Sequence, residues 1–300
     1  MKCRYHNACD AILMTQIRGS AFAISMFCIL ICSCRKEYSR EIGVTSNPPL
    51  GDDCVITSIT PYDSATGKGY GSFHITPGTN NLAEKIEWFD STSLTLDFQA
   101  SLTYINDTIR INNNEFFLLD GAGRIKEFNT LENPSDTSSD RYKYTYAYDA
   151  GGHLYGKNWF VMSYSTDVPF FVYKYEWVNE NLVGVEVNEA SGDKRTALRS
   201  ELKYNDVKTV KNFLYYFPDA DELAPYLFAV NMGAKSKNLL EAIIVRIYDS
   251  GGNEILTYNT EYKNYQFSAD DYVTEVYASG DVIDGLPLVN GLTRFEYECK

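Results

Sequence analysis

Tyrosine side chains recur on alternate positions in two short runs, and these are the residues of the sequence best suited to bind a ligand. The first run is Tyr142, Tyr144, Tyr146 and Tyr148; the second, after Phe171, is Tyr173, Tyr175 and Trp177. Alternate residues of a β-strand point to one face of the sheet, so each run predicts an aromatic stripe. A buried tyrosine hydroxyl needs a hydrogen-bond partner. Serial tyrosines therefore favour a partly hydrated surface on which sugars or an amphipathic molecule can stack. The alternative is that the stripes line a curled sheet and satisfy their hydroxyl groups internally.

Residue types that carry catalysis are sparse in this sequence. Beyond the first 33 residues the histidines are His74 and His153, and the spacings typical of serine hydrolases, zinc peptidases and redox dithiols do not occur. Acidic pairs such as Asp270-Asp271 are adjacent, whereas a glycosidase needs two carboxylates several Å apart across a cleft. The sequence therefore predicts no catalytic residue, no metal and no cofactor, with a glycan-directed hydrolase as the alternative.

Asp120, Asp149 and Asp249 each precede a glycine-containing stretch that separates two hydrophobic runs. An aspartate there can accept hydrogen bonds from turn amides, and glycine can adopt the positive φ of a tight turn. The alternating acids and terminal glutamate of an EF-hand calcium loop are missing. These stretches therefore predict hairpin turns.

The rest of the chain from residue 54 shows the strand positions that these turns connect. Apolar residues alternate with polar ones, as in Val183, Val185 and Val187, and turn residues recur at short intervals. This pattern predicts an all-β fold, a strongly curled antiparallel meander of about 12–14 strands, which forms an open or closed barrel-like sheet.

One segment departs from the alternating pattern. Asp219 to Glu222 offers an N-cap and acids for a first helical turn, and Leu223, Tyr226, Leu227 and Val230 follow helical spacing. Gly233 provides a natural stop. The sequence therefore predicts one short helix near 221–231.

The N-terminal segment predicts export. Residues 21–32 form an apolar run too short to span a membrane as a helix, and it ends in Ile31-Cys32-Ser33-Cys34, which looks like the lipobox of bacterial lipoproteins. The start of translation is Met1 or Met14. We expect residues 1–33 to be a lipoprotein signal peptide, 34–50 a flexible tether and 51–300 a single β domain, with Cys34 acylated. A plain secretory signal is the alternative.

Two cysteines, Cys54 and Cys299, follow the predicted lipidation site. An oxidising compartment permits a disulfide between them, which would close a loop of about 245 residues. The alternative is two buried thiols.

The formal net charge of the 300-residue chain is -13. An acidic surface repels phosphate backbones, which disfavours nucleic acid as a partner. The expected contact with the membrane is the N-terminal lipid anchor. We therefore expect an outer-membrane lipoprotein of the cell envelope, on either the periplasmic or the surface side.

These features together resemble an uncharacterised family of Bacteroidota lipoproteins, a domain of unknown function with a porin-like β fold and YD-type hairpin repeats. The resemblance rests on the lipobox, Cys54 in the first strand, the Tyr148-Asp149 and Tyr248-Asp249 turns, and the closing residues 295–299. Asp271 departs from the repeat, which usually has Gly there. The resemblance implies an exported barrel-like domain and carries over no catalytic residue.

The function that these observations predict is that of a non-catalytic binding or structural module of the envelope. Its expected ligand, a glycan or an amphipathic small molecule, would lie on the concave tyrosine-rich face. Besides the hydrolase, a lipoprotein scaffold that binds another protein is an alternative, and an exposed sheet edge would support it.

Overall fold

A computed structural model describes most of the region after residue 53. The described residues are 54–63, 66–69, 71–78, 82–90, 96–133, 136–190, 195–209, 226, 230–281 and 291–299. The predicted signal peptide, the tether and Cys34 lie outside them.

The described residues form 17 β-strands in one sheet and no helix. The strands are β1 (Cys54–Asp63), β2 (Gly71–Pro77), β3 (Ala83–Asp90), β4 (Leu96–Ser101), β5 (Thr103–Ile105), β6 (Thr108–Arg110), β7 (Phe116–Leu119), β8 (Ile125–Leu131), β9 (Arg141–Tyr148), β10 (Leu154–Val161), β11 (Phe171–Val178), β12 (Asn181–Glu189), β13 (Thr196–Thr209), β14 (Asn238–Tyr248), β15 (Glu254–Phe267), β16 (Val273–Gly280) and β17 (Gly291–Cys299). No helix within this described part is long and apolar enough to cross a membrane.

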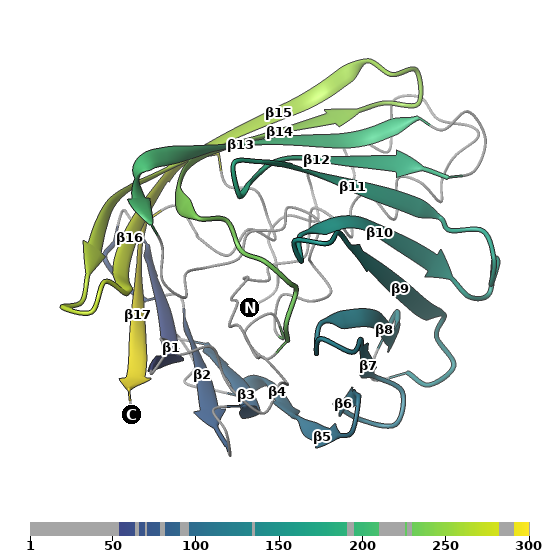
Figure 1. Cartoon of the computed structure of the whole chain (residues 1–300), viewed down its shortest axis with the longest axis horizontal. Helices are drawn as coiled ribbons and strands as arrows, with labels where there is room; N and C mark the ends of the chain where they lie inside the picture. Colours follow the sequence, from purple (N-terminus) through teal and green to yellow (C-terminus); the bar gives the residue numbers. More distant parts are fainter. Residues whose placement is uncertain are drawn as a thin grey trace.

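The sheet curls into a barrel (Figure 1). Strands that follow one another along the chain pair antiparallel, and β1 pairs with both β2 and β17, so the first and last strands meet. Leu102 alone separates β4 from β5; β4 pairs with β3 and β5 pairs with β6, so the two act as one interrupted strand. The predicted all-β antiparallel meander is confirmed, and β1 and β17 bring its two ends together.

The core lies on the inner face of the barrel, because buried residues alternate with more exposed ones along the strands. In β2, Phe73 and Ile75 are buried, whereas His74 and Thr76 are exposed. The structure has more strands than the 12–14 that we predicted from the sequence. The shortest are β5 and β6, which have three residues each. Three residues are too few to show an alternating pattern.

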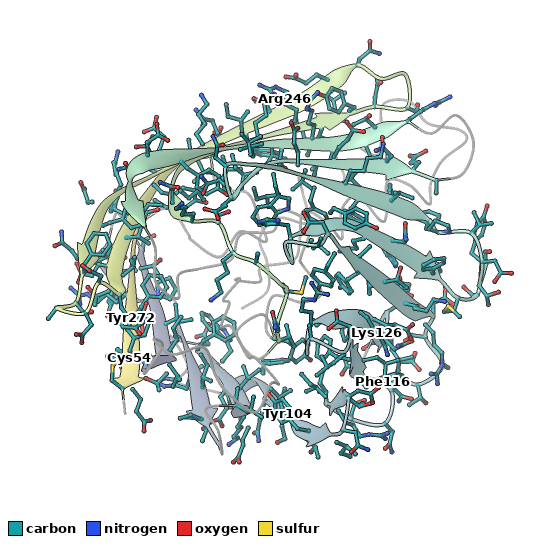
Figure 2. The ribbon with its side chains drawn as sticks, viewed as in Figure 1. Cys54, Tyr104, Phe116, Lys126, Arg246 and Tyr272 are labelled. Carbon is teal, nitrogen blue, oxygen red and sulfur yellow. A yellow bond between two sulfur atoms is a disulfide. The ribbon has the colours of Figure 1, made fainter. Side chains whose placement is uncertain are left out.

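A disulfide joins the ends of the sheet at the β1–β17 ladder. Cys54 lies directly opposite Cys299 in the register, and their sulfur atoms are 1.95 Å apart. Figure 2 shows Cys54 at this seam. The bridge therefore links the two strands that close the barrel. It joins residues 245 positions apart in the sequence.

The three aspartate-headed turns share one hydrogen-bond pattern. The Oδ1 atom of Asp149 accepts the backbone N–H of His153 at 2.9 Å, and that of Asp249 accepts the N–H of Asn253 at 2.8 Å. These backbone hydrogen bonds hold the pKa of both carboxyl groups below its usual range. In the third turn the N–H of Arg124 donates to Asp120 at 2.9 Å. The carboxylates are thus engaged in turn formation, as the sequence pattern predicts.

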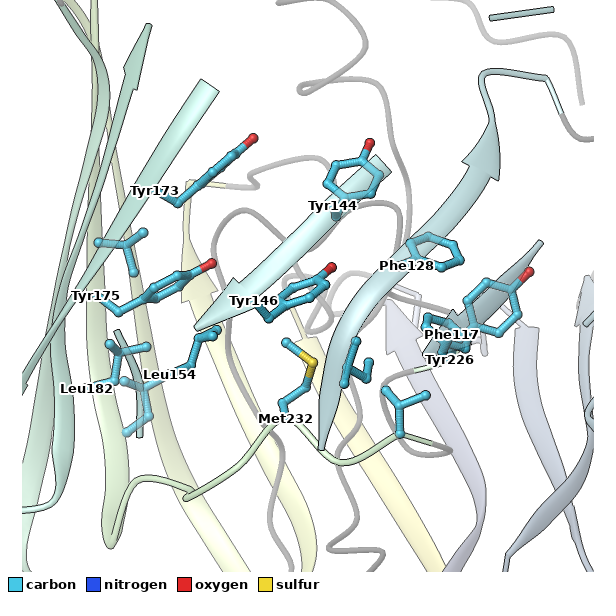
Figure 3. Packing of buried hydrophobic residues seen from close by; sticks show 14 of the residues in the cluster. Phe117, Phe128, Tyr144, Tyr146, Leu154, Tyr173, Tyr175, Leu182, Tyr226 and Met232 are labelled. Carbon is cyan, nitrogen blue, oxygen red and sulfur yellow. The ribbon is translucent and has the colours of Figure 1, made fainter. Parts of the chain in front are cut away.

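Residues 230–238, which we call the strap, lead from the end of the predicted helix into the first residue of β14. The helix predicted near 221–231 falls almost wholly outside the described residues; of its span only Tyr226, Val230 and Asn231 are described, and none of them is helical. Tyr226, Val230 and the strap residue Met232 are buried in the hydrophobic core. Figure 3 shows Met232 with other buried residues of this core.

The strap binds the ends of three successive hairpins. Its hydrogen bonds run from Ile125 N to Asn231 O (2.9 Å), from Ala234 N to Gly152 O (2.8 Å), from Lys237 N to Glu180 O (3.0 Å) and from Asn238 N to Asn181 Oδ1 (2.9 Å). A side-chain ion pair between Lys237 and Glu180, 2.7 Å long, adds to these contacts. Because the strap is bonded to all three hairpins, it fixes the spacing of neighbouring hairpins at one end of the barrel.

We expect Gly233→Ala to lower the free energy of unfolding by about 2 kcal/mol or more. Gly233 has a φ of +88°, and an added Cβ would overlap the carbonyl oxygen of Gly152 and come within 2.9 Å of the Tyr148 ring. Urea unfolding followed by circular dichroism measures the loss. Gly252→Ala is the matched control, since Gly252 also has a positive φ, +80°, and nothing lies within 4 Å of its added Cβ. Equal stability of the two variants would contradict the role given to the strap.

Candidate functional site: the aromatic inner face

A row of five aromatic rings crosses five neighbouring strands on the inner face of the barrel. Phe117 of β7 lies opposite Phe128 of β8, which lies opposite Tyr144 of β9. Tyr144 in turn lies opposite Trp159 of β10, which lies opposite Phe171 of β11. Directly opposite residues of antiparallel strands share one face, so the register alone places all five rings in line. We call these five residues the aromatic row.

The rings of the aromatic row stack on one another along the whole row. Successive ring centroids are 4.4, 5.9, 5.7 and 5.8 Å apart, and the ring planes differ by 18°, 20°, 26° and 27°. Offset stacking at these distances adds to the free energy gained by burying the rings. Tyr144 is fully buried at 0% exposure. The aromatic row is therefore a continuous stacked wall inside the barrel.

Tyr144 and Tyr146 of β9 and Tyr173 and Tyr175 of β11 project to the same inner side (Figure 3). Tyr146, Tyr173 and Tyr175 are buried, and Tyr142 is half-buried with its ring edge against Trp159. The register thus brings the two stripes together around β10, which lies between them. The two stripes thus lie on one inner surface of the curled sheet.

Tyr148 and Trp177, the last members of the two stripes, have a different position. The Tyr148 hydroxyl donates to the carbonyl oxygen of Ile125, and the Trp177 ring N–H donates to that of Leu154, both at 2.8 Å. Each acceptor is the first residue of the return strand of a neighbouring hairpin. Burial raises the pKa of Tyr148, so its hydroxyl stays protonated and able to donate. These two side chains therefore connect adjacent hairpins by hydrogen bonds.

The same kind of hydrogen bond, from a tyrosine hydroxyl to a backbone carbonyl oxygen of a neighbouring hairpin, recurs elsewhere in the barrel. Further examples are Tyr104 to Ala83 O (3.1 Å), Tyr265 to Leu240 O (2.5 Å) and Tyr297 to Val273 O (2.6 Å). In each pair the aromatic residue lies between 21 and 25 residues after its acceptor. Part of the tyrosine richness of this sequence thus serves to join hairpins.

Lys157 is the residue of this face that sequence reasoning missed. It lies on β10 between Tyr146 and Tyr173 in the register and is 2% exposed. Its ammonium nitrogen is 4.3 Å from the ring centroid of Tyr173 and 4.9 Å from that of Tyr144. A signal was present in the sequence, because Lys157 shares the alternate-position spacing of Trp159 and Val161. The inner face therefore combines stacked rings, phenolic hydroxyls and a buried cation.

His153 and Glu115 are not members of the aromatic row. His153 sits in the β9–β10 turn, where its Nδ1 is 3.1 Å from Asp149 and its ring lies over Trp177. Glu115 is the one carboxylate counted as buried within the described ranges, and it accepts a hydrogen bond from Thr130 at 2.8 Å. No cluster of three or more metal-binding side chains occurs among the residues that the structure describes.

Comparisons with known proteins identify the fold. The structure is similar to that of a porin-like protein from Bacteroides uniformis ATCC 8492, with a TM-score of 0.52 and 11% sequence identity over 82% of this chain and 97% of that one. A porin-like protein from Bacteroides vulgatus ATCC 8482 gives a TM-score of 0.48 and 13% identity over 82% and 99% of the two chains. No model of a protein family matches the chain, and no curated protein matches it.

The chain is thus an all-β protein with a barrel-like sheet, and the porin-like fold expected from the sequence is confirmed. At 11% identity the similarity concerns the fold alone. The lipoprotein family and its YD-type repeats stay a prediction from the sequence.

Proposed function

We propose that this protein is a lipid-anchored, non-catalytic binding module of the bacterial outer membrane, and that its aromatic inner face holds a glycan or an amphipathic molecule. The observation that carries the proposal is the buried ammonium of Lys157 beside the stacked aromatic row. Lysine is rarely buried to this degree, and a wall built only for packing would use an aliphatic residue there. Flat rings that stack on a sugar or an acyl chain, together with a cation and phenolic hydroxyls, suit an amphipathic ligand.

Trp159 supplies a probe for this binding because it is the fourth ring of the aromatic row. We expect one member of a panel of neutral glycans, fatty acids and zwitterionic detergents to change the tryptophan emission of the intact protein in a saturable manner. We expect the association to be slow, since the rings are buried and the ligand must open the interior. Trp159→Phe should remove most of the change, whereas Trp88→Phe should retain it.

Lys157→Met and Tyr173→Phe test which groups the ligand uses. Each keeps the side-chain bulk and removes a polar group, so we expect the affinity to fall by about tenfold. Tyr155→Phe is the matched control, because Tyr155 lies on β10 and its side chain is 53% exposed. A saturable change that survives both inner-face variants, or the absence of any change across the panel, would refute the inner face as the binding site.

The membrane anchor has its own test. We expect Cys34→Ala to abolish incorporation of labelled fatty acid and to release the protein from the membrane fraction, since the acyl chains supply the attachment. Cys32→Ala, two residues earlier in the predicted signal peptide, is the control and should leave both unchanged. Membrane association of the Cys34 variant equal to that of the wild type would contradict a lipid anchor there.

Neither alternative function gains a supporting observation from the described residues. A glycan hydrolase needs two carboxylates that face each other across a cleft, and Glu115 is the one buried carboxylate among the described residues. A scaffold that pairs through its sheet edge needs free terminal strands, and β1 is paired with β17 along its length.

A further inference from the structure

The outer surface of the barrel carries a pocket of about 500 Å³ that is separate from the aromatic inner face. It lies between the ends of two hairpins, β12–β13 and β14–β15. Its lining is Glu186, Arg195, Thr196, Arg199, Tyr248 and the turn residues 250–252. Arg199 is exposed and its neighbours Leu198 and Ser200 are more buried, so the Arg199 side chain points away from the core.

The arginines around this pocket differ in their ion pairs. Arg246 lies opposite Arg199 in the register, on the outer side of the barrel (Figure 2), and forms ion pairs with Glu201 at 2.6 Å and with Glu254 at 3.7 Å. The hydrogen bond to Glu201 raises the pKa of Arg246. Arg199, by contrast, has no ion pair to another described residue. The pocket therefore presents the Arg199 guanidinium, which lies opposite Glu186 in the register but forms no ion pair with a described residue.

Other contacts hold the pocket walls in place. Arg195 donates through Nη1 to the carbonyl oxygen of Ser250, which ties the two hairpins together. The carboxylate of Glu186 accepts a hydrogen bond from Asn188 at 2.8 Å and is thereby positioned on the pocket wall. Tyr248, at the end of β14, shares the outer face with Arg246 and is half-buried. The pocket thus combines two cations, one anion and one aromatic ring on two linked hairpins.

We propose that this pocket binds an acidic sugar, a hexuronate residue of a polysaccharide. Arg199 would form a charge-assisted hydrogen bond to the sugar carboxylate, for which the planar guanidinium is well suited. Glu186 would accept a ring hydroxyl, and the face of Tyr248 would stack on the sugar ring. The carboxylate of Glu186 favours a ligand with hydroxyl groups and a single negative charge over a phosphate, which carries more charge. This proposal is independent of the ligand proposed for the inner face.

Titration calorimetry with galacturonic acid oligosaccharides tests the proposal on the intact mature protein. Neutral galactose oligosaccharides of the same length are the ligand control. We expect saturable binding of the acidic oligosaccharide alone, and a weakening as salt is raised, because an exposed charge pair is screened. Binding of both oligosaccharides with equal affinity, or of neither, would overturn the proposal.

Two variants locate the site. We expect Arg199→Gln to weaken uronate binding by about tenfold or more and Tyr248→Ala to weaken it by a similar factor. Arg294→Gln is the matched control, since Arg294 is also exposed on the outer surface and pairs with Glu275 at 2.8 Å. Wild-type affinity in the Arg199 variant would overturn the assignment. Tyr173→Phe should leave uronate binding unchanged, which separates this site from the inner face.

Discussion

Replacement of Tyr144 by alanine is expected to lower the free energy of unfolding by about 3–5 kcal/mol. Tyr144 is the central ring of the aromatic row and is fully buried, with stacked rings on both sides at 5.9 and 5.7 Å. Its removal leaves a cavity between β8 and β10 that the neighbouring strands cannot fill without breaking their hydrogen-bond ladders. Urea unfolding monitored by tryptophan emission and circular dichroism measures the loss.

Tyr155→Ala provides the matched control for this prediction. Tyr155 is the same residue type on the adjacent strand β10, and its side chain is 53% exposed. We expect its replacement to change the free energy of unfolding by no more than about 0.5 kcal/mol. A loss at Tyr144 no larger than that at Tyr155 would show that the aromatic row is not part of a packed core.

Loss of the Cys54–Cys299 disulfide is expected to destabilise the barrel by up to about 5 kcal/mol. The bridge closes a loop of 245 residues, so its absence restores a large conformational freedom to the unfolded chain. It also joins the two strands whose pairing closes the sheet. The Cys54→Ser/Cys299→Ser double variant should therefore melt at a lower temperature than the oxidised wild type.

Reduction supplies the control for this second prediction. A reducing agent should lower the melting temperature of the wild type towards that of the double variant and leave the double variant unchanged. The intact mature wild type should also gain the mass of two hydrogen atoms on reduction. A wild-type melting curve that does not respond to reduction would contradict a stabilising bridge.

The strand pattern was predictable because it depends on neighbouring residues. The alternation in β2 and β11 and the aspartate-glycine turns after Tyr148 and Tyr248 are local features with local physical causes. Strands of three residues, such as β5, are too short to show a period by themselves.

The roles of individual tyrosines could not be predicted from that pattern. Tyr144 and Tyr148 have the same spacing in one stripe, yet the first stacks inside the barrel and the second donates to Ile125. The difference depends on what the next strand places opposite each ring, and that information lies in the register between strands. Lys157 was missed for the same reason, since only the register places it between Tyr146 and Tyr173.

By itself the sequence determined that this protein is an antiparallel all-β chain with hairpin turns, because strand alternation and turn chemistry are encoded within a few residues. The tertiary structure alone decided that the strand ends meet, that the tyrosine stripes face inward around Lys157, and that two hairpins enclose the outer pocket at Arg199. Pairing of β1 with β17 joins residues more than 200 positions apart, and no local pattern specifies which side of a curled sheet becomes its inside.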